Sequence, residues 1–185
     1  MKVIAIQSSP NRDGLTVACA SAALRGAQKA GAETDLITLT DLVIHTCLMC
    51  DRNKSLCHEK GRCEQKDDFN MLRETVNAAD AVVFATPVYF GDPSEVAKCF
   101  LDRWRRCEVI DRDKSVLRGK RIIGIAAAGG SGMGAITTLG SLERYFQWLQ
   151  FTIWELAPVT QINRRWALKA IEEAGRTMVT EPLPV

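Results

Sequence analysis

The run AVVFATPVYF, from Ala81 to Phe90, is the most continuous apolar stretch of the chain. It lacks the strict alternation of apolar and polar residues that marks a strand with one solvent-exposed face. Gly-Asp-Pro follows it directly, so that a turn is expected at its end. An uninterrupted apolar run of this length is typical of a strand buried on both faces. We therefore predict a central strand of a parallel sheet here.

Similar runs on either side predict the rest of the sheet. Four further strands are predicted in residues 2–9, 33–42, 119–130 and 151–160. Helices are predicted in residues 15–29, 67–80, 92–106, 134–150 and 164–179. This alternation implies an α/β fold with helices on both faces of a parallel sheet, because each crossover returns over the sheet with the same hand. For a chain this short, the flavodoxin-like five-stranded order 2-1-3-4-5 is the most economical.

Composition indicates an ordinary globular protein. The chain has 185 residues, 46% of them hydrophobic, with 24 Lys and Arg against 22 Asp and Glu. A single domain over residues 1–185 is expected at this length, and nothing in the charge balance calls for nucleic acid. No apolar run approaches the roughly 20 residues of a membrane span, and the N-terminus lacks a secretory signal. We therefore expect a cytoplasmic protein with no membrane partner.

Ligands of such sheets bind beyond the carboxyl ends of the strands, where the strand order reverses. The first loop there is SSPNRDGLT, residues 8–16, which offers three hydroxyl groups, the guanidinium of Arg12 and a glycine before a helix. Backbone N–H groups and the helix dipole favour an anion at such a position. The loop lacks both common nucleotide-binding glycine motifs. It predicts a phosphate site, the alternative being a capped helix after an ordinary turn.

Two more loops meet the first at this edge. The loop TPVYFGDPS, residues 86–94, offers an aromatic and apolar wall for a flat ring, although such a stripe can also be core. The loop AAAGGSGMGA, residues 126–135, carries four glycines, which let backbone approach a ligand closely. Together the three loops predict a mononucleotide with a flat ring system, which in this fold means FMN.

These loops, with the stretch from Cys47 to Trp104, resemble the NADPH-dependent FMN reductase family of the flavodoxin-like superfamily. The resemblance covers Met1 to about Glu155. It implies that FMN accepts hydride from NAD(P)H and passes electrons to a small acceptor such as a quinone, a flavin or a metal ion. The implied cofactor-binding residues are Ser9, Arg12, Gly14, Leu15 and Thr16 for the phosphate, and Pro87, Val88, Tyr89, Phe90, Gly91, Gly129 and Gly130 for the ring.

The resemblance also implies a homodimer or homotetramer. Lys98, Asp102 and Arg103 then belong to a structural or subunit-facing helix. No residue is identified as an obligatory catalytic acid or base, because flavin chemistry can take its proton from water.

A second feature is the stretch CLMCDRNKSLCHEKGRC, which spaces Cys47, Cys50, Cys57 and Cys63 as C-x2-C-x6-C-x5-C. It lies in a cysteine-rich loop expected over residues 44–66. The iron-sulfur flavoproteins of this family carry a similar motif, C-x2-C-x2-C-x5-C. The middle spacing differs here, and Asn53 stands where the third cysteine would be. The four cysteines are candidate ligands of a [4Fe–4S] cluster that would receive electrons from a ferredoxin-like protein.

Several alternatives stay open for this loop. It can be a metal-free loop near the flavin, a zinc site with His58 or His45 as a substitute ligand, or a pair of disulfides. A thiol or metal sensor built on this fold is a further hypothesis. Cys19, Cys99 and Cys107 fall on predicted helices, where we expect them to be packing residues and not ligands.

Overall fold

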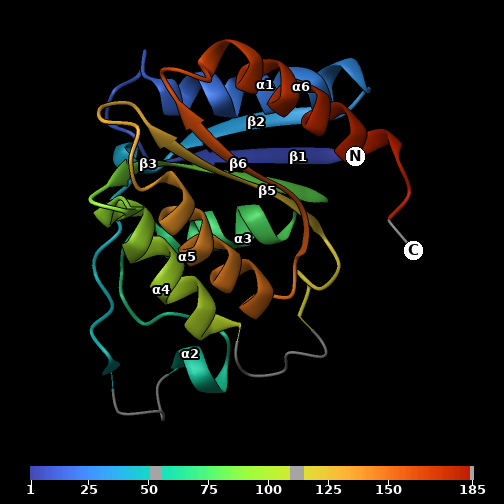
Figure 1. The fold of residues 1–185 in the computed structure, drawn as a ribbon. Coiled ribbons are helices and arrows are strands. Elements are labelled where there is room, and N and C mark those ends of the chain that lie inside the picture. Colours follow the sequence, from blue (N-terminus) through green and yellow to red (C-terminus); the bar gives the residue numbers. More distant parts are fainter. Residues whose placement is uncertain (51–55, 109–114, 184–185) are drawn as a thin grey trace.

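The computed structural model describes residues 1–50, 56–108 and 115–183, and its centre is a parallel β-sheet (Figure 1). Asn53 lies outside the described residues. The five parallel strands are β1 (Lys2–Gln7), β2 (Glu33–Thr38), β3 (Ala81–Tyr89), β5 (Arg121–Ala128) and β6 (Thr152–Thr160). They lie in the order β2-β1-β3-β5-β6. The predicted flavodoxin-like order 2-1-3-4-5 is therefore confirmed.

One short strand was not predicted. Residues Asp92–Pro93 form β4, which pairs antiparallel with the end of β3, Val88 opposite Pro93 and Tyr89 opposite Asp92. The stretch expected to be a loop therefore begins as strand and turns back on itself. This hairpin fixes the direction in which the aromatic residues at its tip project.

Helices cover both faces of the sheet (Figure 1). One layer consists of α1 (Leu15–Lys29) and α6 (Arg164–Thr180), and the other of α3 (Phe69–Asn77), α4 (Glu95–Cys107) and α5 (Ala135–Trp148). Two short elements, η1 (Leu39–Asp41) and α2 (Leu56–Glu59), lie between β2 and α3 in sequence. The α2 turn is the part of the described chain drawn farthest below the sheet, next to α4.

Each layer has its own apolar core because successive side chains of a strand point to opposite faces. The core under α1 and α6 is rich in alanine, and the two helices touch at Gly26 and Gly175. A Cβ at Gly26 would overlap the carbonyl of Glu172, which explains glycine within this helix. The opposite core is aromatic, with Phe84, Phe100 and Trp104 all 0% exposed.

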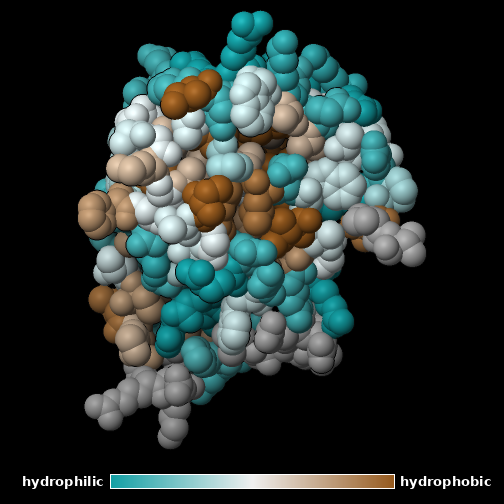
Figure 2. Space-filling view, viewed as in Figure 1, coloured by the Kyte–Doolittle hydropathy of each residue, from teal (hydrophilic) through white to brown (hydrophobic). Residues whose placement is uncertain are grey.

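The last strand, β6, is an edge strand and is only partly buried. Figure 2 shows apolar side chains in the middle of the face viewed, between the two helical layers. A hollow of about 250 Å³ lies along this edge, lined by Leu156, Pro158 and Trp166 among others. Within the described residues, no helix combines the length and the apolar character that crossing a membrane requires.

Candidate functional site

The first two predicted loops are joined by buried hydroxyl groups. Ser8 follows β1, and its Oγ donates a hydrogen bond to Oγ1 of Thr86 at 3.0 Å. Ser94 donates from its Oγ to Oγ of Ser8 at 3.0 Å and accepts from the backbone N–H of Ala97 at 3.4 Å, which caps α4. Ser8, one of the three hydroxyls expected to face an anion, is only 1% exposed and instead fixes the loops to each other.

The predicted phosphate loop leads directly into α1. Ser9 is 6% exposed, with its backbone N–H donating to Oε1 of Gln7 at 2.7 Å and its Oγ accepting from the N–H of Asn11 at 3.2 Å. Gly14 is the N-cap residue, and no side chain caps the helix. The N–H groups of the first turn, which include those of Leu15 and Thr16, have no partner within the helix. This N-terminus is therefore available to an anion.

Two nearby side chains, those of Thr16 and Arg12, could also bind an anion at this site. The hydroxyl of Thr16 makes no hydrogen bond within the described part of the chain, although the residue is only 3% exposed. Arg12 pairs with Asp41, Nη2 to Oδ1 at 2.6 Å, and its side chain is 73% exposed. An exposed pair of this kind contributes about 0–1 kcal/mol, so Arg12 can exchange Asp41 for a phosphate at small cost.

The other two loops meet at glycines. Gly91 has φ +86° and Gly134 has φ +81°, a region that residues with a Cβ rarely adopt. A Cβ on Gly134 would lie 2.7 Å from Cα of Gly91, so the approach of the loops requires glycine. Between them is a hollow of about 370 Å³ whose lining includes Val88, Phe90 and Met133.

The surface of this hollow suits a flat ring. Phe90 lines it and is fully exposed at the hairpin tip with φ +52°, whereas Tyr89, 43% exposed, does not line it. Gly129 and Gly130 do not line the hollow but precede Ser131, which does, and a Cβ on either would meet nothing within 4 Å. Apolar side chains beside bare backbone can hold one face and the edge of a ring system. The uncapped helix and this hollow together fit FMN.

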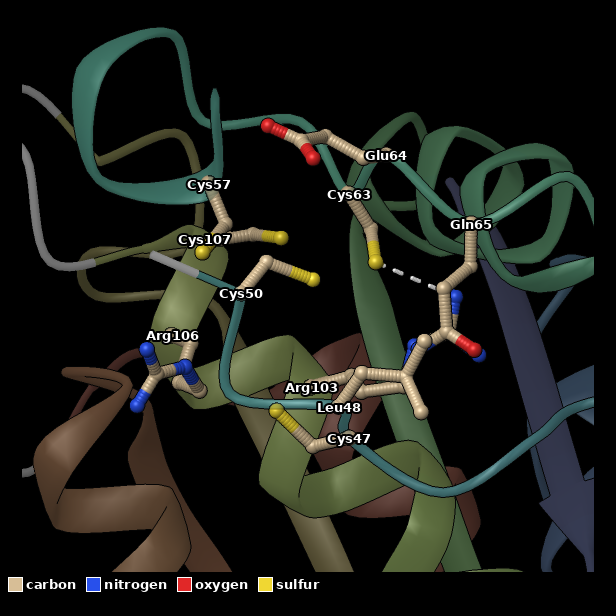
Figure 3. A pocket seen from close by; sticks show the side chains of 10 residues that line it. All are labelled: Cys47, Leu48, Cys50, Cys57, Cys63, Glu64, Gln65, Arg103, Arg106 and Cys107. Carbon is tan, nitrogen blue, oxygen red and sulfur yellow. Dashed lines mark hydrogen bonds between the residues drawn. The ribbon is translucent and has the colours of Figure 1, made fainter. Parts of the chain in front are cut away.

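A second site is built by the cysteine-rich segment. Cys47, Cys50, Cys57 and Cys63, the four predicted ligands, all line one small cavity. Its volume of about 20 Å³ is room for about one water molecule. Figure 3 shows that Cys107, the last residue of α4, extends its side chain into the same space. Cys107 packs in the apolar core, as expected of it, and its side chain also lines this cavity.

A buried ion pair supports the cavity. Arg103 is 1% exposed, and it binds both carboxylate oxygens of Asp67, Nη1 to Oδ2 at 2.5 Å and Nη2 to Oδ1 at 2.8 Å. It also donates to the carbonyl of His45 at 3.0 Å and to Sγ of Cys63 at 3.2 Å (Figure 3). This one guanidinium therefore ties both ends of the cysteine-rich segment to α4.

The ionised forms of this pair are favoured by their contacts. Burial opposes the charge on Asp67, but hydrogen bonds from Arg103 and from the backbone N–H groups of His45 and Phe69 outweigh it, so the pKa of Asp67 lies below its ordinary value. Burial likewise opposes the charge of Arg103, yet its hydrogen bonds to Asp67 and Cys63 hold its pKa above the ordinary value. The Nε atoms of Arg103 and Arg106 are buried and have no hydrogen-bond partner in the described residues.

The same cavity contains a strongly perturbed thiol. Burial, opposed by the nearby Arg73 and reinforced by Cys63 and Cys57, raises the pKa of Cys107 to about 12. Cys107 is therefore a neutral thiol when no metal is bound, whereas a metal-bound thiol is deprotonated. None of the seven cysteines, all of which are described, forms a disulfide, so the alternative of a disulfide-bonded loop is not seen.

The donor set of this cavity fits an iron-sulfur cluster, because thiolates are the usual cluster ligands and guanidinium groups offset their charge. As arranged here, no three His, Cys, Asp or Glu side chains of the described residues are placed to hold a metal ion. At about 20 Å³ the cavity is smaller than a cluster, so binding one requires the thiols to lie farther apart. Neither His45 nor His58, the substitute ligands considered for zinc, lines the cavity.

The two sites lie at opposite ends of α4. Ser94 caps the start of the helix and is hydrogen-bonded to Ser8 in the first of the three loops. Cys107 ends the helix and lines the cavity formed with the four cysteines of the segment, here called the thiol cavity. A helix of 13 residues spans about 20 Å. Within one chain, the two candidate sites are therefore separated by about the length of this helix.

Comparisons with known proteins identify the family and the fold of the chain. The family model for NADPH-dependent FMN reductase matches residues 1–156, and the chain belongs to this family. An iron-sulfur flavoprotein of Methanocaldococcus jannaschii is 30% identical over 146 residues, which cover 79% of this chain and 72% of that protein. Another iron-sulfur flavoprotein, from Archaeoglobus fulgidus, is 38% identical over 105 residues, covering 57% of this chain and 49% of the relative.

Solved structures show the same fold. An NAD(P)H:quinone oxidoreductase from Methanothermobacter marburgensis aligns with a TM-score of 0.70 at 17% identity. The alignment covers 100% of this chain and 98% of that one. The flavodoxin-like fold is thereby shown, and the predicted class of enzyme, a flavin-dependent oxidoreductase of this family, is confirmed.

Four residues of the thiol cavity and its support were not predicted from the sequence: Arg103 and its ion-pair partner Asp67, and the cavity-lining residues Arg106 and Cys107. A signal for Cys107 and Arg103 was present, since residues four apart lie on one face of a helix. Nothing local in the sequence shows that this face meets the cysteine-rich segment.

Proposed function

We propose that the protein transfers electrons from NAD(P)H, through FMN bound at the three loops, to a small acceptor such as a quinone, a free flavin or a metal ion. The observation that carries this is the pairing of an uncapped helix N-terminus at Gly14 with an open, partly apolar hollow at Gly91 and Gly134. When bound, FMN supplies hydride acceptance and the release of electrons.

The residues of the chain itself bind the phosphate of FMN and orient its ring. The amides of Leu15 and Thr16 and the free hydroxyl of Thr16 can donate to a phosphate, and the helix dipole adds to this attraction. Val88 and Phe90 form an apolar wall, and the bare backbone at Gly129 and Gly130 leaves room for the edge of a ring.

The test is an anaerobic titration of FMN-loaded protein with NADPH and with NADH. Loss of the flavin absorbance with either nucleotide supports the proposal, and the more effective nucleotide identifies the physiological donor. An unchanged spectrum with excess of both would exclude a pyridine-nucleotide oxidoreductase while leaving FMN binding intact.

A second candidate function is electron transfer through an iron-sulfur cluster. The convergence of Cys47, Cys50, Cys57 and Cys63 on one cavity with two guanidinium groups favours it, and the curated relatives are named iron-sulfur flavoproteins. A ferredoxin-like donor is proposed for this function. Iron and acid-labile sulfide, measured in protein prepared without air, decide it: both must be present in amounts comparable to the chain.

We also propose that the protein is a homodimer or homotetramer. The partly exposed apolar hollow along β6, where Trp166 is 64% exposed, supports a contact with a second copy. Arg103, considered for a subunit contact, is buried within the chain, whereas Lys98 and Asp102 lie at a surface hollow. Light scattering after size-exclusion chromatography, compared between wild type and Trp166→Glu, tests this.

A further inference from the structure

The thiol cavity contains one more cysteine than the sequence motif supplies. Four thiols come from the cysteine-rich segment, and the fifth, Cys107, comes from the last turn of α4. The other two cysteines behave differently: neither Cys19 nor Cys99 lines the cavity, although Cys99 stands on the same helix. The position of Cys107 is therefore not explained by a general abundance of cysteine.

Hydrogen bonding places Cys63 against the face of α4 that carries Cys107. Arg103 precedes Cys107 by four residues, so their side chains lie on neighbouring turns of one helix face. Arg103 donates to Sγ of Cys63 at 3.2 Å. Cys63 and Cys107 thus face the same cavity from the segment and from the helix.

Cys107 is also more deeply buried than the segment thiols. The preceding turns of α4 are fixed in the aromatic core by Phe100 and Trp104, both 0% exposed, and Cys107 itself is 3% exposed. By contrast, Cys47, Cys50, Cys57 and Cys63 are only partly buried. A buried side chain on a packed helix is a preorganised ligand.

The charge around the cavity suits an anionic centre. Arg103, Arg106 and one carboxylate, Glu64, line it, and each guanidinium has a buried Nε without a hydrogen-bond partner in the described residues. One of these guanidinium groups is already neutralised by Asp67, which leaves Arg106 to offset further thiolate charge. Buried negative charge needs such compensation.

We propose that Cys107 is a metal-centre ligand of this protein, binding iron of the cluster together with thiols of the cysteine-rich segment. This rests on the second candidate function, since it assumes a cluster in the cavity. A four-iron cluster takes four cysteine ligands, so one of the five thiols is dispensable, and that thiol belongs to the segment.

The test uses wild type and single Cys→Ala variants at positions 47, 50, 57, 63 and 107, with Cys99→Ala as the matched control on α4. Each protein is reconstituted anaerobically with ferrous iron and sulfide. Iron, sulfide and charge-transfer absorbance are then measured per chain. FMN content and circular dichroism show that each variant is folded, and Cys107→Ser provides a variant of nearly unchanged volume.

The expected result is that Cys107→Ala and Cys107→Ser lose most of the iron and sulfide while Cys99→Ala keeps both, and that one variant of the segment also keeps them. Full retention of iron, sulfide and absorbance by both Cys107 variants would overturn the inference and leave the cluster function standing. Failure of wild type to take up iron and sulfide would overturn both together.

Discussion

Arg103 and Asp67 form a two-pronged ion pair that is sealed from solvent, with side chains 1% and 0% exposed. The pair joins α4 to the stretch that precedes α3, and its guanidinium also lies over the ring of Phe69 at 4.3 Å. Removing one partner of a buried pair leaves an uncompensated charge, which costs far more than losing a surface pair. The pair is therefore the main electrostatic support of the thiol cavity.

Replacement of Asp67 tests this support. Asp67→Asn leaves the charge of Arg103 buried without its partner and is expected to lower the free energy of unfolding by about 3–5 kcal/mol in urea denaturation. The matched control is Glu173→Gln, which removes a carboxylate from an exposed pair with Arg176. The control should leave stability nearly unchanged. Equal effects of the two variants would contradict the role given to burial.

From the lowered pKa of Asp67 we predict that the free energy of unfolding depends on pH. The pKa of Asp67 is lowered from 3.8 in the folded chain, so the unfolded chain binds its proton more readily. Its contribution to stability is therefore present above about pH 4 and is lost as the pH falls through the folded value. Urea denaturation between pH 7 and pH 3 should show a steeper loss in wild type than in Asp67→Asn. Parallel curves for the two proteins would count against this assignment.

Thr16 provides a test of the phosphate site. Its hydroxyl is free of partners in the described structure and stands in the first turn of α1, so Thr16→Val removes a donor without changing the side-chain volume much. Hydrogen bonds to charged groups contribute about 1.5–3 kcal/mol, which corresponds to roughly ten- to a hundredfold weaker FMN binding. Riboflavin, which has no phosphate, is the control ligand, and its affinity should not change. An equal loss for both ligands would place Thr16 elsewhere.

Gly130 tests the ring site. A Cβ there meets nothing in the protein, so Gly130→Ala should leave the thermal unfolding midpoint unchanged. We expect FMN to bind about tenfold or more weakly, because a methyl group forced into a filled site costs about 1–3 kcal/mol. Gly140→Ala, within α5 and away from the hollow, is the control and should keep the wild-type affinity. Unaltered affinity in Gly130→Ala would mean that the ring does not approach this backbone.

Much of the fold follows from local patterns in the sequence. The helix predicted for residues 15–29 is α1 with the same bounds, because an alanine-rich stretch lies between a glycine cap and the AGAE stop. The strand order also follows, since apolar runs alternating with helices leave few topologies. The hairpin of β4 was missed because two residues carry no periodicity, and its antiparallel pairing depends on the positive φ of Phe90 and Gly91.

The sites were less predictable where they depend on tertiary contacts. The meeting of the three predicted loops could be foreseen because parallel strands bring their carboxyl ends to one edge. The pairing of Asp67 with Arg103 joins residues 36 positions apart, and no local pattern marks it. The same holds for Cys107, because its place in the cavity depends on the packing of α4 against the cysteine-rich segment.

The most direct test of the central claim is a fluorescence titration of cofactor-free protein with FMN and, separately, with riboflavin. We expect saturable binding of one FMN per chain. FMN should bind at least tenfold more tightly than riboflavin, because the N-terminus of α1 binds the phosphate. No saturable FMN binding, or equal affinity for the two ligands, would contradict it.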